Sequence, residues 1–257
     1  MLVDQLQTNP QIPVRAVKHQ LESNLEVKIH PQKAFRALQK AKKTLKGDYK
    51  DQYGDLRDYV IELRRSNPGS TVKIEVEDCH DPSSSTRVFK RIYICLGACN
   101  RGFRAIGRDL LGVDGAFMKE PASGFLLTDV GLDCNNGIYP LAYAIVESEC
   151  LSSWTWFLEL VASDLELNEM SNFTFISDRQ KGLISAVAKV FPVAEHRFCL
   201  RHIHENMKKN WRGACATATT VPQFERAMAA FKDFSEPAYV YLTKIPPAQW
   251  TRSHFSG

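Results

Sequence analysis

LLGVDGAF (residues 110–117) is the first of three short apolar runs that follow one another, and GFLLTDVGL (124–132) and IYPLAYAIVE (138–147) are the next two. Their length and composition predict β-strands. The chain continues with SSWTWFLELVASDL, NFTFISD, KGLISAVAKVF and EHRFCL, which predict helix, strand, helix and strand in that order. Three strands in series followed by alternating helix and strand indicate an α/β fold, a mixed sheet flanked by helices. In such a sheet, groups at strand ends converge on a crevice where ligands bind.

The regions outside these runs follow other patterns. Residues 11–66 have helical periodicity, and we expect Phe35 and Leu38 to share the apolar side of one helix. An Asn-Pro-Gly stop at 67–69 ends this region, and the period-two alternation over 72–77 predicts a strand. We therefore expect four regions: a basic helical N-terminal region at 1–70, a strand and linker at 71–108, the sheet domain at 109–204 and a C-terminal helical segment at 205–257.

Charge is distributed unevenly along the chain, although the net charge is only +4. Residues 15–46 contain nine Lys or Arg and two acidic residues, whereas residues 120–170 contain nine acidic residues and no Lys or Arg. This asymmetry suits a nucleic-acid enzyme, in which basic side chains neutralise phosphates and carboxylates hold cations. Lys40, Lys42 and Lys43 are the candidate DNA contacts in the basic region. A solvated helix face remains the alternative.

Composition is that of an ordinary globular protein. The 257 residues are 44% hydrophobic, enough to bury a full core. The N-terminus has no apolar signal segment, and no apolar run is long enough to span a membrane, so we expect an intracellular protein without a membrane partner. Seven cysteines, an odd number, argue against a disulfide framework, and we expect most of them to be free thiols.

Two aspartates end apolar, strand-like runs and are the main candidates for catalysis. Asp114 lies in LLGVDGAF and Asp178 in FTFISDRQKGL. Enzymes that cut DNA with two divalent ions need carboxylates from separate elements, because the ions lie about 4 Å apart astride the scissile phosphate. Each aspartate also has a structural alternative. Asp114 precedes a glycine, as in a tight turn, and Asp178 or Ser177 is placed to cap the following helix.

Further candidates follow the last predicted strand. Cys199 and His202 form a Cys-x-x-His pair, but structural zinc takes four ligands. Cys95 and Cys99 are the only obvious second pair, so we consider zinc unlikely. Glu205 is either a substitute third acid or a solvated partner of nearby lysines.

A basic cluster lies in the same part of the chain and is a candidate for phosphate contact, consisting of Arg197, Arg201, Lys208, Lys209 and Arg212. Four acidic residues of the central region are expected to be surface carboxylates: Asp129, Asp133, Glu147 and Glu149.

Several blocks, in this order, resemble the transposases of plant Mutator-like elements: GDYKDQYGDLRDYVIELRRSNPGSTV, FKRIYICLGACNRGF, LGVDGAFMK, IYPLAYAIVESE, SWTWFLELVASDL, FISDRQKGLI, FPVAEHRFCLRHI and IPPAQWTRSHFSG. The resemblance extends from about residue 30 to the C-terminus. It implies an RNase H-like catalytic domain of the DDE type, with Asp114 and Asp178 as catalytic metal ligands. It also implies that Cys199 and His202 lie near the active site.

The same resemblance implies partners and a third acid. Mg²⁺ or Mn²⁺ would be the cofactor, DNA with terminal inverted repeats the substrate, and the nucleus the location. A homo-oligomer is possible, and no small-molecule substrate is expected. In the family the third acid, a glutamate in Asn-x-x-Glu-x-Phe-Asn, follows a Trp-x-Arg-x-His-Phe segment, which here is Trp250–Phe255. We therefore expect a truncated site in this chain.

Two functional hypotheses follow. The first is a Mutator-like transposase core that descends from an enzyme of DNA transposition and recombination, with catalysis uncertain because the third carboxylate is missing. The second is a domesticated nuclear DNA-binding or transcription-regulatory protein that retains the fold as a scaffold. A protein-interaction module without a nucleic-acid role is a further alternative.

Overall fold

The computed structural model describes residues 2–9, 12–46, 53–78, 87–119, 124–168, 170–206 and 214–255. The chain divides into two compact units, Met1–Leu63 and Arg64–Gly257, and each is described by itself. None of the helices in the described ranges combines the length and the apolar character that crossing a membrane requires.

The first unit is helical. It contains α1 (Leu2–Thr8), α2 (Val14–Leu25) and α3 (Pro31–Lys46), and α5 (Leu56–Ser66) runs across the boundary with the second unit. Its small core includes Leu6, Val17 and Leu38. The expected place of Phe35 is wrong, because its side chain is 50% exposed and Ala34 is buried instead. Ala34 and Leu38 are one turn apart on the same helix face, and Phe35 lies about 100° away from that row.

Seven strands of the described residues form one mixed sheet in the second unit, in the order β1-β2-β5-β4-β3-β6-β7. Neighbouring strands are antiparallel except that β6 is parallel to both β3 and β7. This mixed α/β sheet with flanking helices confirms the predicted fold class and is consistent with an RNase H-like fold. The strands are β1 (Thr71–Asp78), β2 (Arg87–Cys95), β3 (Leu110–Met118), β4 (Gly124–Leu132), β5 (Ile138–Val146), β6 (Thr174–Ser177) and β7 (Glu195–Phe198).

The helix α7 (Leu151–Leu165) packs on β2 and β5 and supplies much of the main core. Trp154, Phe157 and Leu158 are fully buried on it, whereas Trp156 is only partly buried, as expected for two tryptophans two residues apart. Near its C-terminus, Asp164 accepts hydrogen bonds from Thr71 Oγ1 (2.6 Å) and Tyr93 Oη (2.7 Å). These bonds fasten the last turn of α7 to the first two strands.

Two further helices accompany the sheet. α8 (Lys181–Val190) packs against α7, and Gln180 caps its N-terminus by accepting a hydrogen bond from Leu183 N (2.6 Å). α6 (Gly97–Ile106) was not predicted, because its apolar residues are few. Phe103 anchors it, and a Cβ at Gly131 would lie only 2.2 Å from the Phe103 ring. A glycine on β4 is therefore what allows α6 to approach the sheet.

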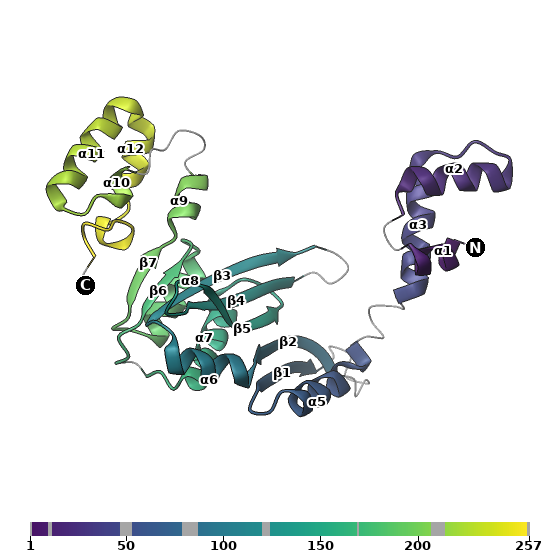
Figure 1. Ribbon diagram of the computed structural model, residues 1–257, viewed down its shortest axis with the longest axis horizontal. Coiled ribbons are helices and arrows are strands. Elements are labelled where there is room, and N and C mark those ends of the chain that lie inside the picture. The colour runs from purple at the N-terminus through teal and green to yellow at the C-terminus, as the bar shows by residue number, and fades with distance from the viewer. Residues whose placement is uncertain are drawn as a thin grey trace. The chain divides into compact units, whose positions relative to one another are not determined.

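The C-terminal part of the second unit is a helical cluster with its own core. It comprises α9 (Leu200–Asn206), α10 (Ala214–Thr217), α11 (Val221–Phe234), α12 (Glu236–Thr243) and η1 (Pro247–Gln249) (Figure 1). Ile203, Phe224, Leu242 and Trp250 meet in this core together with Phe198 at the end of β7. The cluster is therefore packed against the last strand of the sheet.

The position of Asp129 differs from the one that the sequence predicted. It was expected at the surface, but it lies on β4 with 1% exposure, and neither carboxylate oxygen has a hydrogen-bond partner among the described residues. Burial raises the pKa of Asp129 to about 8. The alternation of side chains along β4 places it inside, on the same face as Leu127.

Replacing Asp129 with Asn should stabilise the protein most at alkaline pH. The folded-state pKa lies above the unfolded value of 3.8, so wild-type stability falls as pH rises from about 4 to about 8, while only the unfolded chain loses the proton. Each unit of pKa displacement corresponds to about 1.4 kcal/mol. Urea unfolding of both proteins at pH 5 and pH 8 measures the effect.

The exposed Asp233 on α11 provides the matched control, and Asp233→Asn should follow the wild type at both pH values. An Asp129→Asn variant that gains no stability at pH 8 relative to pH 5 would contradict the assignment of a buried, unpartnered carboxyl group.

Candidate active site

Asp114 and Asp178 come together because β3 and β6 are parallel neighbours. Their paired residues run from Leu110↔Thr174 to Val113↔Ser177, and one step further along both strands are the two aspartates. Adjacent strands are about 4.8 Å apart. The Asp114 side chain is 55% exposed, and Asp178 is half-buried. Two carboxylates from separate elements therefore lie side by side, one in the middle of β3 and one directly after the end of β6.

The structural alternatives for these aspartates are wrong. Asp114 and Gly115 are not a turn, since both pair with β4 within a strand that continues to Met118. Asp178 is not the N-cap of α8, because Gln180 occupies that position.

One oxygen of each carboxylate is nonetheless bound by nearby backbone. Gly115 N donates to Asp114 Oδ1 (2.9 Å), and Gln180 N donates to Asp178 Oδ1 (3.0 Å). These bonds orient the carboxylates without neutralising them.

The Cys-x-x-His pair borders the same site. Cys199 N donates to Ser177 O (2.6 Å), which extends the pairing of β7 with β6 up to the aspartates. His202, on α9, places Nε2 3.9 Å from Asp114 Oδ2, and its Nδ1 is buried without a hydrogen-bond partner among the described residues. His202 therefore lies beside Asp114.

Glu149 is a third carboxylate beside the pair and was missed by sequence reasoning. It is half-buried rather than a surface residue. Its pKa is raised, first by burial and then by the negative charges of Asp178 and Asp114, while the Trp154 indole N–H acts in the opposite direction. Glu149 therefore lies near enough to both aspartates for their charges to raise its pKa.

The sequence contained one signal for Glu149. β3, β4 and β5 are consecutive antiparallel neighbours, so β5 ends at the same edge of the sheet as β3. Glu149 comes shortly after the end of β5.

A groove of about 480 Å³ opens between β7 and the C-terminal helices. Arg197, Cys199, Arg201, Arg252 and Phe255 are among the residues that line it. Arg197 Nη1 is held by Glu195 Oε1 (2.9 Å), and its guanidinium lies over the Phe255 ring at 4.7 Å. The groove is therefore both basic and aromatic.

The other basic residues predicted to contact DNA differ in their exposure and in their partners. Arg201 is 82% exposed and pairs with Glu205 (2.9 Å), so Glu205 is a partner of arginine. Lys208 and Lys209 lie outside the described residues, as does Arg212. In the first unit, Lys40 is exposed on α3, Lys42 is half-buried, and Lys43 lies on the same helix.

The donor chemistry suits a divalent metal, although a complete coordination sphere is not formed. Within the described ranges, no three His, Cys, Asp or Glu side chains converge as a group that could hold an ion. Carboxylate oxygens are the ligands that Mg²⁺ and Mn²⁺ prefer, and Asp114 and Asp178 supply them from neighbouring strands. The residues present therefore fit such an ion by chemistry, given movement of their side chains.

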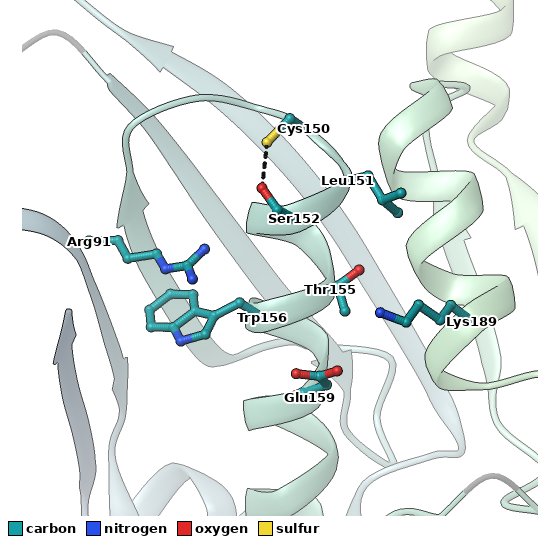
Figure 2. A pocket seen from close by; sticks show the side chains of 8 residues that line it. All are labelled: Arg91, Cys150, Leu151, Ser152, Thr155, Trp156, Glu159 and Lys189. Carbon is teal, nitrogen blue, oxygen red and sulfur yellow. Dashed lines mark hydrogen bonds between the residues drawn. The ribbon is translucent and has the colours of Figure 1, made fainter. Parts of the chain in front are cut away.

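A second depression, of about 650 Å³, lies along the outer side of α7 (Figure 2). Arg91 and Trp156 lie on one side of the helix there and Lys189 on the other, and Cys150 lies at its N-terminal end. Neither aspartate lines it. This depression is therefore distinct from the candidate active site.

The comparison with known proteins agrees with this geometry. Residues 110–206 match the family model described as the MULE transposase domain. No curated protein matches the chain. The matched segment runs from the start of β3 to the end of α9 and includes Asp114, Glu149, Asp178, Cys199 and His202. The chain therefore carries a MULE transposase domain at residues 110–206.

Proposed function

We propose that this protein cuts and joins DNA strands by divalent-metal catalysis, with Asp114 and Asp178 as metal ligands. One observation carries the proposal: the two aspartates directly follow the last residue pair of two parallel strands, inside the segment that matches the transposase domain. A transposase family implies DNA as the partner and a divalent ion as the cofactor, for which we propose Mg²⁺ or Mn²⁺.

The surrounding residues support this role in distinct ways. A divalent ion held by Asp114 and Asp178 would lower the pKa of an attacking water or 3′-hydroxyl and stabilise the charge that develops on the phosphate. Backbone N–H groups of Gly115 and Gln180 hold the two carboxylates in place. His202 lies against Asp114 and, when protonated, would attract a DNA phosphate to the same edge.

DNA contact is proposed along the basic groove beside β7. Arg197 and Arg201 line it, and Lys208 and Lys209 follow Arg201 in the chain. Lys40, Lys42 and Lys43 of α3 would add contacts from the first unit. DNA with terminal inverted repeats as substrate, a nuclear location and a homo-oligomeric assembly belong to the same proposal. So does the division into regions 1–70, 71–108, 109–204 and 205–257.

Asp114→Asn and Asp178→Asn should each abolish metal-dependent nicking of supercoiled plasmid DNA. Each substitution removes a negative charge from the ion site, and loss of one such electrostatic contact reduces turnover by about 100-fold or more. The assay compares conversion to the nicked form in Mg²⁺ or Mn²⁺ with conversion in EDTA. Asp233→Asn, on the exposed side of α11, is the control. Undiminished nicking by Asp114→Asn would refute the proposal.

A DNA-binding role without catalysis is the second candidate. It is favoured by the lack, within the described ranges, of a complete three-ligand metal group beside a basic groove. In that role the protein would bind duplex DNA but fail to nick it in any metal.

Arg201→Gln should weaken DNA binding and reduce its salt dependence, whichever role applies. An arginine that contacts one phosphate contributes about 0.9 to the slope of log K against log salt concentration. Fluorescence anisotropy of a labelled duplex at several salt concentrations measures this slope. Arg104→Gln is a matched control, because Arg104 on α6 pairs with Glu166 at the C-terminal end of α7 and does not line the groove. Equal slopes for both variants would place DNA elsewhere.

A further inference from the structure

Asp178 lies just beyond the part of β6 that strand pairing holds in place. The register of β6 and β7 runs to Ser177↔Phe198, and Asp178 is the next residue. Cys199 N donates to Ser177 O (2.6 Å), so this bond holds the carbonyl before Asp178 and not that of Asp178 itself. The direction of the Asp178 backbone therefore depends on contacts outside the sheet ladder.

The Ser177 hydroxyl provides one such contact. Its Oγ donates to Asp178 O (2.7 Å), and Ser177 is only 1% exposed. At the carboxylate, Gln180 N donates to Asp178 Oδ1 (3.0 Å). Asp178 is thus held at its backbone carbonyl by Ser177 and at its side chain by Gln180. Loss of the first bond would free the backbone that carries the carboxylate.

His196 on β7 completes a chain of hydrogen bonds that has a fixed direction. Its Nε2 lies 2.7 Å from Ser177 Oγ. A serine hydroxyl has a single proton, and here Ser177 gives that proton to Asp178 O. The proton between His196 and Ser177 must therefore belong to Nε2, so His196 is the donor. Donation to a hydroxyl oxygen strengthens the bond that the same hydroxyl donates onward.

Burial and packing hold the imidazole of His196 in this role. The side chain is half-buried, and its ring meets the Phe198 ring edge-on, with 5.5 Å between the ring centroids. Burial lowers the pKa of His196 to about 4, although the negative charge of Asp178 acts in the opposite direction. The ring is therefore neutral at pH 7 and carries one N–H, which the contact with Ser177 places on Nε2.

We propose that His196 is a positioning residue for Asp178, acting through Ser177 on the backbone that carries the metal-binding carboxylate. The inference rests on the proposed function, because it requires Asp178 to be a metal ligand. A carboxylate held in one orientation binds an ion more tightly, since less conformational freedom is lost on binding. Replacing a group that orients a metal ligand typically reduces metal affinity or activity by about 10- to 100-fold.

Two substitutions of His196, made in the whole chain, separate positioning from packing. His196→Phe keeps an aromatic ring and removes the donor, whereas His196→Gln keeps an N–H donor on a side chain without a ring. In calorimetric titration, His196→Phe should bind Mn²⁺ at least about tenfold more weakly than the wild type, and His196→Gln should recover most of the affinity. A role in packing alone would give the reverse order, because phenylalanine fills the site better than glutamine.

Ser177→Ala interrupts the same chain at its middle and decides the question if His196→Phe fails to fold. Its loss of Mn²⁺ affinity should match that of His196→Phe, and the double variant should be no weaker than either single variant, since both remove one link. His254→Phe is the matched control. His254 is also half-buried and has Nδ1 2.9 Å from a serine hydroxyl, that of Ser253, so this variant should bind Mn²⁺ like the wild type.

The direction of the chain has a test of its own that needs no metal. Nuclear magnetic resonance of isotope-labelled protein at pH 7 distinguishes the two tautomers of a neutral imidazole. His196 should be protonated at Nε2. A ring protonated at Nδ1 would overturn the proposal, whatever the protein binds.

The outcomes separate this inference from the proposed function. Unchanged Mn²⁺ affinity in His196→Phe and Ser177→Ala, with affinity lost in Asp178→Asn, would overturn the role of His196 and leave the proposed function standing. Additive losses in the double variant, or an equal loss in His254→Phe, would indicate a general loss of packing and also overturn it. A wild type that binds no Mn²⁺, with or without a DNA duplex, would defeat both.

Discussion

The parallel pairing of β3 with β6 is the constraint on which the candidate site depends. Parallel strands run in the same direction, so residues one step beyond their last pair lie at the same edge. Val113 and Ser177 are that last pair. Both side chains are buried in the core, and this burial fixes the register of the two strands. A slip by one residue would exchange buried and exposed positions along the whole strand. The core therefore sets the positions of Asp114 and Asp178.

The C-terminal helices complete the surroundings of these aspartates. Arg179, directly after Asp178, donates from Nη1 to Tyr241 Oη on α12 (3.3 Å). Arg197 of β7 donates from Nη2 to Thr251 O, and Trp250 is buried in the core that also contains Ile203 of α9. The helix that carries His202 is thus anchored by contacts more than forty residues distant in sequence.

Burial of a polar side chain is the property that the sequence pattern predicts least well. Asp114 and Asp178 follow short apolar runs, and the sequence pattern shows this directly. Asp129 sits in an equally apolar run, and only the register of β4 shows that it faces inward. His196 is similar: burial lowers its pKa to about 4, and its Nε2 lies 2.7 Å from Ser177 Oγ. Such environments depend on neighbouring strands, not on the residue's own segment.

The sequence by itself determined the α/β class and the succession of strands and helices from β3 to β7, because these depend on local periodicity and composition. Only the tertiary structure decided that Glu149 is half-buried, that Glu205 pairs with Arg201, and that α6 forms. Each of these depends on contacts between segments far apart in the chain. Gly131 illustrates the reason. Its lack of a side chain matters only because Phe103, far away in the sequence, occupies the space that a Cβ would fill.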